Sequence, residues 1–343
     1  MLFWQIILTE RVLRVPGFIT HYICGEATIN ELPRDIKVIL QNSRQLYNVG
    51  SQGPDMFFYY LPGLIKKNIK NIGVHMHKSN VRTFFSNMLD IQNAADSEER
   101  LMIFSYICGY LSHYALDCNA HPYVYYKSGF QVEGDKTSRL RYSVRHRSFE
   151  TAIDVLMLKV MSGEKPASMK LWQLIKADKC QAMVIANALS NAINMAYDRH
   201  ISQREVFSAI SYMVGMTRVL QSKRGYRKKL MELAEDLTIG EHVVSSIIHM
   251  QEIKDGKDYL NLKKQPWYMP WDGDNEINHS FGEMYSQAVV DGSRLIKANY
   301  KYLTGSIIKE ELLIDIGNRS MASGLDIDQD KAFCVHGNMS KQA

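Results

Sequence analysis

Three residues with metal-binding side chains lie four apart in one apolar stretch of the sequence: His113, Asp117 and His121. In an α-helix, side chains four residues apart project from the same face, so the two imidazoles and the carboxylate would point the same way. Burying three such groups is costly unless a ligand satisfies them. We therefore predict that this helix contributes to a metal site. The alternative is that these side chains are core residues satisfied by hydrogen bonds.

A second pair with the same spacing follows, formed by His146 and Glu150. The pair alone is weak evidence, because His279 and Glu283 show the same spacing. His146 and Glu150 are favoured because they lie on the next long helical stretch, which can run antiparallel to the first. Periodicity alone leaves a purely structural role open.

Further candidates lie earlier in the chain. His21 belongs to the first helical stretch, and Asp55 follows a Gly-Pro turn that can direct a carboxylate inward. His75 and His77 are two apart, so both would face one side of an extended segment, and we expect one of them to be a ligand. Each residue alone is typical of a structural or solvated position, and the case for them is that they accompany the helical triplet.

The donor set consists of histidine nitrogens and carboxylate oxygens without cysteine. Such a set suits zinc in a catalytic site, where an open coordination position is kept for water. Zinc in that position makes water a nucleophile at neutral pH and stabilises negative charge on a phosphoryl oxygen. The residues therefore predict a metal-dependent hydrolase.

Helices must position these side chains, because the sequence has few helix breakers. It contains 8 prolines and 21 glycines in 343 residues, with 46% hydrophobic and 22% charged residues. This composition and the apolar periodicity predict an all-α globular protein. We expect a loop at 47–63 and helices at 18–32, 35–46, 80–91, 97–120, 137–161, 167–175, 180–197, 203–222, 226–253 with a break near Gly240, and 280–303.

The chain is expected to have four parts. Residues 1–15 form an N-terminal extension, 16–165 the metal-binding domain, 166–305 a helical region packed on or beside it, and 306–343 a weakly structured tail. The apolar run at 2–8 is too short to span a bilayer and lacks the flanks of a signal peptide. Five dispersed cysteines without a CxxC pair favour a reducing compartment, so a cytoplasmic location is expected. The net charge of +5 suits an anionic substrate or membrane surface but requires neither.

Several segments resemble the bacterial zinc-dependent phospholipase C family, which is distantly related to zinc single-strand nucleases. They are PGFITHYICGE, QGPDMFFY, HMHKSNVRTFF, GYLSHYALDCNAHPYVYYKS, VRHRSFETAID and the WYMPW–NHSF region at 267–281. The likeness is strongest from Pro16 to Glu150 and extends loosely to about residue 300. It is closest to the non-toxin, intracellular-looking branch.

The resemblance implies an all-helical phospholipase C-like domain with up to three zinc ions bridged by carboxylates. One zinc would be held by Asp55, His77, His113 and Asp117, a second by His121, His146 and Glu150, and a third by His21 with Asp117. The family's Gly-Pro-Asp carboxylate is the suggested general base, which gives Asp55 a catalytic role as well.

Two features depart from the secreted members of the family. In those members a freed N-terminal residue binds the third zinc, whereas twenty residues precede His21 here, so we expect two zinc ions and leave the third open. One hypothesis is that translation starts at Val15, which would make residues 1–14 an artefact. The second departure is spacing, since only three residues separate Asp117 from His121 where secreted members have five.

The expected activity is hydrolysis of a phosphodiester by metal-activated water, and a phospholipid head-group bond is one candidate substrate. One alternative is a zinc nuclease or phosphatase, although nucleic acid is not the expected partner. The other is a non-catalytic, metal-stabilised helical binding protein. Peripheral membrane contact is compatible with the sequence, and the oligomeric state is open. The aromatic run at 57–60 could line a cleft, but a packing role is favoured.

Overall fold

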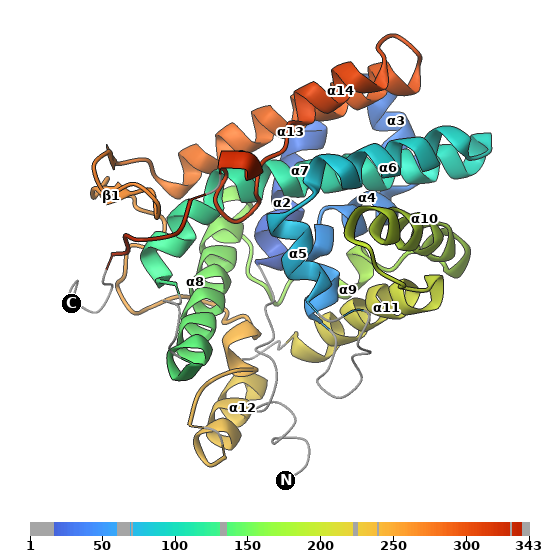
Figure 1. The fold of residues 1–343 in the computed structure, drawn as a ribbon. Coiled ribbons are helices and arrows are strands. Elements are labelled where there is room, and N and C mark those ends of the chain that lie inside the picture. Colours follow the sequence, from blue (N-terminus) through green and yellow to red (C-terminus); the bar gives the residue numbers. More distant parts are fainter. Residues whose placement is uncertain are drawn as a thin grey trace.

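The computed structural model describes residues 17–59, 69, 71–130, 136–221, 226–238, 240–329 and 331–337. Helices make up most of these ranges, which confirms the all-α prediction (Figure 1). The strands found there are β1 (Trp267–Tyr268) and β2 (Glu276–Ile277), which pair antiparallel. The expectations for an N-terminal extension and an alternative start at Val15 lie outside the described residues.

The described chain forms a series of helical elements before residue 165. They are α2 (Phe18–Asn30), α3 (Arg34–Asn42), α4 (Arg44–Gly50), the 3₁₀ helix η1 (Gly53–Phe58), α5 (Ile72–Lys78), α6 (Val81–Ala94), α7 (Ser97–Ser128) and α8 (Lys136–Ser162). Those that follow are α9 (Leu171–Leu174), α10 (Lys179–Tyr197), α11 (Gln203–Leu220), α12 (Tyr226–Asp236), the 3₁₀ helix η3 (Ser245–Ile247), α13 (Phe281–Leu303), α14 (Lys309–Ile316) and η4 (Ile327–Gln329).

Helix α7 is the centre of the molecule. It is 32 residues long, and its side chains are buried almost without interruption from Ile103 to Val124. A helix that is apolar on all sides must be surrounded by other elements. Helices α2, α4, α6, α8, α10 and α13 all pack against α7. The predicted metal-binding triplet is therefore carried by the most enclosed helix described.

Helix α7 contains a proline that frees one backbone carbonyl near the metal-binding residues. Pro122 has no N–H to donate to the carbonyl of Cys118 one turn earlier. The guanidinium of Arg319 fills this position, donating to the Cys118 oxygen at 3.3 Å. A residue after α14 thus satisfies a carbonyl that the helix itself leaves open.

The described part of the segment 306–343 differs from the expected weakly structured tail. It contains α14, and the chain after it returns to α7, where the Tyr114 hydroxyl donates to the Ile316 carbonyl and accepts from the Arg319 N–H, both at 3.0 Å. Met321 is fully buried. Long-range contacts order this part of the chain, and local periodicity does not reveal such contacts.

Three other local expectations were wrong. The helix expected over 226–253 with a break near Gly240 ends at Asp236 and does not resume as an α-helix, because the buried Glu235 carboxylate accepts the N–H groups of Val244 and Ser245 and holds the chain in a turn. The helix expected at 167–175 is reduced to α9, and the loop expected at 47–63 contains the end of α4 and all of η1.

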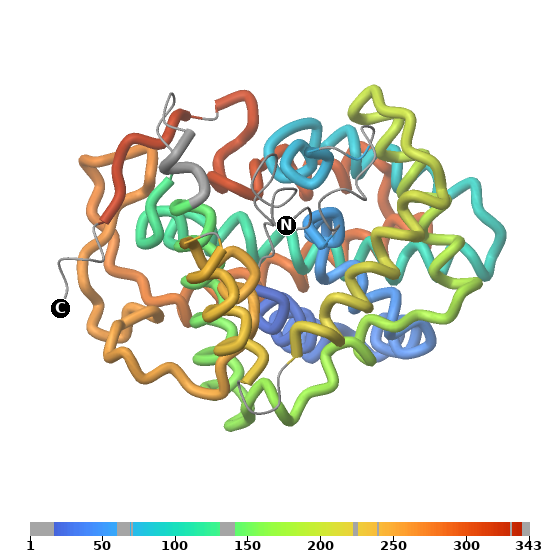
Figure 2. The backbone as a smooth tube through the Cα atoms, turned by 90° about the horizontal axis from the view of Figure 1, so that it is seen from below, coloured from blue at the N-terminus to red at the C-terminus, as the bar shows by residue number. Residues whose placement is uncertain are grey.

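Elements from both halves of the sequence lie side by side. Helix α13 packs along α7 and α2, and η3 packs against α8 (Figure 1). Viewed from below, α12 lies in the foreground (Figure 2), at the opposite edge of the molecule from α13 and α14. None of the described helices is long and apolar enough to cross a membrane.

Candidate metal centre

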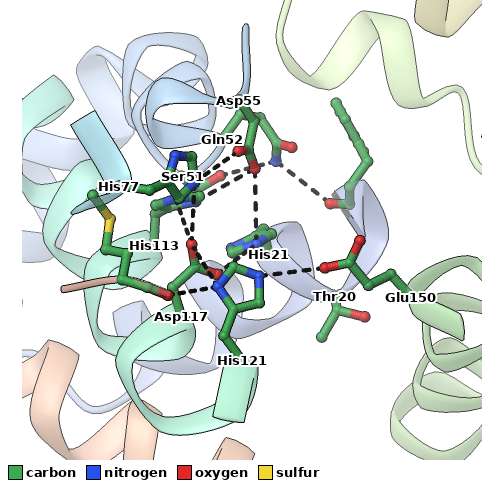
Figure 3. A network of polar contacts seen from close by, with 12 residues as sticks. Thr20, His21, Ser51, Gln52, Asp55, His77, His113, Asp117, His121 and Glu150 are labelled. Atoms are coloured by element: carbon green, nitrogen blue, oxygen red, sulfur yellow. Dashed lines mark hydrogen bonds and ion pairs between the residues drawn. The ribbon is translucent and has the colours of Figure 1, made fainter. Parts of the chain in front are cut away.

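Five elements bring all the predicted site residues together. Helix α7 supplies the central triplet, and the other side chains come from α2, η1, α5 and α8 (Figure 3 labels all but His146). The gathered residues are His21, Asp55, His77, His113, Asp117, His121, His146 and Glu150.

Asp117 lies at the centre of the group. Its carboxylate is buried, and four histidine rings surround it (Figure 3). The nitrogen-to-oxygen distances are 3.3 Å for His21, 3.5 Å for His77, 3.1 Å for His113 and 3.5 Å for His121. The Asp117 carboxylate thus lies within 3.5 Å of four histidine nitrogens.

Asp55 is aimed at the same group by η1. Its Oδ1 lies 3.1 Å from Nε2 of His77, and its Oδ2 lies 3.9 Å from Nδ1 of His113. Gly53 begins this turn with a φ of +49°, and a Cβ at that position would lie 2.3 Å from the His113 ring. The Gly-Pro-Asp sequence therefore allows the backbone to approach the imidazole closely enough to direct the carboxylate inward.

His113 is fully buried, and its ring nitrogens are left without hydrogen bonds. Its side chain has no solvent exposure, and neither ring nitrogen has a partner in hydrogen-bonding geometry. Burial lowers its pKa, so the ring is neutral, and the His21 ring stacks on it at 4.2 Å. Both oxygens of Asp55 also lack hydrogen-bond partners. Buried polar atoms are almost always satisfied, so these unpaired donors fit a bound cation.

A second cluster joins α7 to α8. Oε1 of Glu150 lies 3.3 Å from Nε2 of His121 and 3.2 Å from Nε2 of His146. The His146 side chain is 19% exposed, whereas those of His121 and Glu150 are at most 9% exposed. Access from solvent is therefore greatest at the His146 end of this cluster.

Backbone and hydroxyl groups hold three of the rings in orientation. Nδ1 of His77 lies 2.6 Å from the Gly73 carbonyl, and Nδ1 of His121 lies 2.6 Å from the Met321 carbonyl. Nδ1 of His146 lies 3.2 Å from the Ser128 hydroxyl. In each case Nε2 is left facing the carboxylates, as in metal sites where a second hydrogen bond fixes the ligand ring.

Met321 connects the backbone of His77 to the ring of His121. Its N–H donates to the His77 carbonyl at 2.8 Å, and its carbonyl accepts from His121. The sequence analysis missed this residue. A contact made by backbone atoms leaves no side-chain signal, and the segment itself had been expected to lack structure.

Asp154 is a second supporting residue that the sequence analysis missed. It is fully buried on α8, one turn after Glu150, and accepts from the N–H groups of Ile19 at 3.0 Å and Thr20 at 2.7 Å. It also accepts from Nε2 of His249 at 2.7 Å. Asp154 therefore satisfies the first turn of α2, the helix that carries His21. The repeated four-residue spacing from His146 through Glu150 to Asp154 could have revealed it.

The electrostatics show how the carboxylates stabilise the rings. Burial opposes protonation of His77, but the adjacent carboxylates of Asp117 and Asp55 outweigh it and raise the pKa of His77 to about 10. Burial is likewise outweighed at His121, where Asp117 and Glu150 raise the pKa to about 9. Against the effect of burial, neighbouring His146 and His121 lower the pKa of Glu150 to about 2. The raised pKa values of His77 and His121 mean that, when no metal ion is bound, these rings hold protons instead.

The structure decides between alternatives left open by the sequence. His77 is buried in the site, whereas His75 is exposed, because residues 72–78 are helical and not extended. His279 and Glu283 are exposed, and Glu283 forms a capping box with Ser280 at the start of α13. In the aromatic run, Phe57 and Tyr59 are buried and Phe58 stacks on His77 at 5.6 Å, while residue 60 lies outside the described residues.

The donor atoms fall into three groups, each with its atoms within 4.8 Å of one another. Their members are His21, Asp55 and His113; His77, His113 and Asp117; and His121, His146 and Glu150. The third group is the set that the resemblance implies for one zinc ion. His113 belongs to both of the other groups. The resemblance instead assigned His113 to one zinc ion and His21 to another, so the two ligand sets are divided differently in the structure. His21 is close enough to Asp117 to serve either arrangement.

Comparison with known proteins adds one finding. A family model described as zinc dependent phospholipase C matches residues 20–205. Comparisons with curated proteins and with solved structures gave no match. The matched range covers more than half of the chain and includes every residue of the metal centre from His21 to Glu150.

Proposed function

Since the chain belongs to the zinc-dependent phospholipase C family, we propose that it hydrolyses a phosphodiester and that a phospholipid is its substrate. The observation that carries this proposal is the buried, neutral His113, whose ring nitrogens lack hydrogen-bond partners and face carboxylates on two sides. Nitrogen and oxygen donors without cysteine suit zinc in a catalytic site.

We assign the zinc ligands to the three donor groups. His77, His113, Asp117 and Asp55 would hold one ion, and His121, His146 and Glu150 a second. His21 with Asp117 or Asp55 offers a position for a third ion. When bound, zinc supplies a water nucleophile at neutral pH and positive charge opposite the phosphoryl oxygens.

The protein's own residues would handle the proton. Asp55 is directed into the centre by η1, and we propose that it accepts the proton of the attacking water. A bond then forms between the water oxygen and phosphorus, and the bond from phosphorus to the leaving oxygen breaks. The proton passes to the leaving alkoxide, so that the products are an alcohol and a phosphomonoester. His77, through its contact with Asp55 at 3.1 Å, would help to orient that carboxylate.

The proposal is tested by zinc content and turnover measured on the same preparation. Purified protein should carry at least two zinc equivalents and release phosphocholine from phosphatidylcholine vesicles. Asp55→Asn should lower kcat by about 10²–10⁴-fold while the circular dichroism spectrum stays unchanged. Asp274→Asn, at an exposed aspartate outside the centre, is the matched control and should retain full activity. Protein that lacks zinc, or an Asp55→Asn variant with normal turnover, would contradict the proposal.

One observation favours nucleic acid as a second candidate substrate. Aromatic rings continue outward from the more exposed end of the centre: Tyr125 lies 4.7 Å from His146, and Phe333 lies 5.0 Å from Tyr125. Trp271 follows at 6.1 Å from Phe333. Such rings can stack on unpaired bases. Hydrolysis of single-stranded DNA, measured beside the phospholipid assay, decides between the two substrates.

We also propose a cytoplasmic location. All five cysteines are free, and Cys24, Cys108 and Cys118 are buried. Burial raises the pKa of each of these three thiols, so they remain protonated and unreactive. Free thiols of this kind are typical of reducing compartments. Fractionation of the source cells with an antibody to the protein tests this location.

A further inference from the structure

Helix α12 carries an apolar stripe on its outer face. The stripe consists of Tyr226, Leu230, Leu233 and Leu237, which share one face of the helix and of the turn that ends it. Each is more than half exposed, from 58% for Leu233 to 79% for Leu237. A surface helix normally turns such a stripe toward the core, and a contiguous apolar patch on the surface marks an interaction site.

Polar side chains on the opposite face hold α12 in this orientation. The ammonium of Lys228 donates to the carbonyls of Ser245 at 2.9 Å and Ile248 at 3.2 Å. Seven residues later, the buried Glu235 accepts the N–H groups of Val244 and Ser245. Rotating the helix to bury its leucines would break all of these bonds. Because the stripe is already folded and held outward, a partner binds it without the entropic cost of forming the helix.

The spacing of the stripe indicates what kind of partner it fits. Its four residues follow one another at intervals of four, three and four, which is the pattern of the seam between two paired α-helices. If the facing helix is α12 of a second copy running antiparallel, Tyr226 meets Leu237 of that copy, and Leu230 meets its Leu233. Each contact then occurs twice, related by a two-fold axis, so the pairing closes as a dimer.

Two exposed charges lie along one edge of the stripe. Lys229 and Asp236 are seven residues, or about two helical turns, apart, and each directly precedes a leucine of the stripe. Among the described residues, Lys229 forms no ion pair, and Asp236 contacts Nε2 of His242 through Oδ1 alone, at 2.8 Å. In an antiparallel pair this edge faces the same edge of the other helix, so Lys229 of each copy faces Asp236 of the other. The other edge, with Arg227 and Ala234, adds no opposite-charge pair.

We propose that α12 is the interface of a homodimer in which the apolar stripes of two copies pack antiparallel. The stripe supplies the apolar contact, and the pairing of Lys229 with Asp236 sets the direction of the helices. This self-complementary charge favours a second copy over an anionic membrane, which would repel Asp236. The helix lies at an edge of the molecule, where a second copy can approach it (Figures 1 and 2). No metal-centre residue belongs to this interface, so the dimer stands apart from the proposed activity.

Sedimentation velocity of the full-length protein over a concentration series tests the dimer directly. The wild-type protein should show a monomer–dimer equilibrium. Replacing Leu230, Leu233 and Leu237 together by serine should raise the dimer dissociation constant by at least about tenfold, because three apolar side chains per copy are no longer buried in the seam. These side chains are exposed in the single chain, so the melting temperature of the monomer should change little, which circular dichroism verifies.

A matched triple variant controls for the loss of exposed apolar surface in general. Met195, Leu262 and Ile314 are at least 61% exposed and lie on α10, the loop before β1, and α14. Replacing these three by serine should leave the dimer dissociation constant unchanged. Turnover of a short-chain, water-soluble phosphodiester, expressed per chain, should also be unchanged in the α12 variant, which separates dimerisation from catalysis.

Exchanging the two charges tests the antiparallel arrangement. Lys229→Glu and Asp236→Lys should each weaken self-association by about fivefold or more, because like charges then face each other twice across the seam. When the two variants are mixed, every facing pair again has opposite charges. The mixture should therefore form dimers about as tightly as the wild-type protein. A folding defect in either variant would not be repaired by mixing.

Three results would overturn the dimer proposal. The first is a wild-type protein that remains a monomer at about 100 μM, a concentration at which interfaces of micromolar affinity are occupied. The second is that the two triple variants dimerise equally well. The third is a mixture of the two charge variants that associates no more tightly than either variant alone. A monomer that instead floats with phospholipid vesicles through the three leucines would make a membrane the occupant of the stripe.

Discussion

At the scale of single residues, the two carboxylates around His77 determine how a metal-free protein should respond to pH. The pKa of His77 is about 10 in the folded protein and 6.5 as an ordinary histidine. A raised folded pKa contributes stability that is fully present below 6.5 and is lost as the pH rises through 10. His121, with a pKa of about 9, acts in the same direction. We therefore expect protein treated with a chelator to have a lower free energy of unfolding at pH 9 than at pH 6.

Zinc should reverse that dependence, because it takes the place of the ring protons. Histidine and glutamate must be deprotonated to bind zinc, so acid should then be the destabilising condition. Urea unfolding at pH 6 and pH 9, with and without zinc, measures both slopes. Identical pH profiles for the two forms would mean that zinc does not bind at these residues.

Gly53 offers a test of the close contact between η1 and His113. Alanine at this position combines a φ of +49° with a Cβ 2.3 Å from the His113 ring. We expect Gly53→Ala to cost about 2–4 kcal/mol of stability and to reduce zinc content. Gly256→Ala is the matched control, since Gly256 also has a positive φ but nothing within 4 Å of its Cβ. That control should cost only about 1 kcal/mol and keep its zinc.

Spacing predicted the candidate residues on α7 and α8, and the family resemblance added those on α2, η1 and α5, but neither predicted how the side chains share the centre. The triplet on α7 could be found because four-residue intervals align side chains on any helix. The choice of His77 over His75 required knowing that residues 72–78 are helical. That His113 faces both Asp55 and Asp117 depends on the approach of η1 to α7, which no local pattern encodes.

At the scale of elements, Asp154 couples two helices of the centre. Its carboxylate caps α2 from a position one turn beyond Glu150 on α8. Asp154→Asn keeps one acceptor but turns an NH₂ group toward the buried N–H donors, and we expect a loss of about 1–3 kcal/mol. Because α2 carries His21, the variant should also lose zinc from the His21 side of the centre, measured as metal equivalents per chain.

Asp178→Asn is the control for a capping aspartate that lies outside the centre. Asp178 caps α10 by accepting the Gln181 N–H at 3.0 Å, and it is exposed. This variant should cost less than about 1 kcal/mol and should retain all of its zinc. Equal losses of zinc in the two variants would exclude a specific role for Asp154.

The helices were predictable where apolar periodicity is long and continuous, as in α7 and α13. The prediction failed where single polar contacts end an element. Helix α12 was expected to resume after a break near Gly240 and run to residue 253, but the turn held by Glu235 redirects the chain. The residues after Asp236 retain some helical periodicity, so the sequence alone could not show that a buried carboxylate would stop the helix.

At the scale of the whole molecule, the chain after α14 completes the centre. A chain ending after Gly317 would lack Arg319 and Met321, and would leave the Cys118 carbonyl and Nδ1 of His121 without their partners. We expect this truncation to weaken zinc binding at the cluster of His121, His146 and Glu150, measured against a competing chelator. Ending the chain after Gln329 retains both residues and should bind zinc normally. Equal affinities in the two truncated chains would contradict this role.

The arrangement of the two halves of the chain was the least predictable feature. Helix α13 lies against α7 and α2, so a helix expected beside the metal domain packs on the helices that form the centre. Such contacts join residues far apart in the sequence, and they depend on which faces meet in three dimensions. The proposed division at residue 165 remains a prediction.

The backbone contacts of Met321 also have a consequence for the order of events during biosynthesis. Met321 follows all eight donor residues in the sequence, so the ribosome adds it after each of them. Until then the His121 ring lacks the backbone carbonyl that fixes its orientation, and an ion bound early would meet a ring still able to turn. We therefore expect the centre to bind zinc tightly only late in translation. A nascent chain should lose zinc to a competing chelator, or bind another metal ion in its place, more readily than the mature protein.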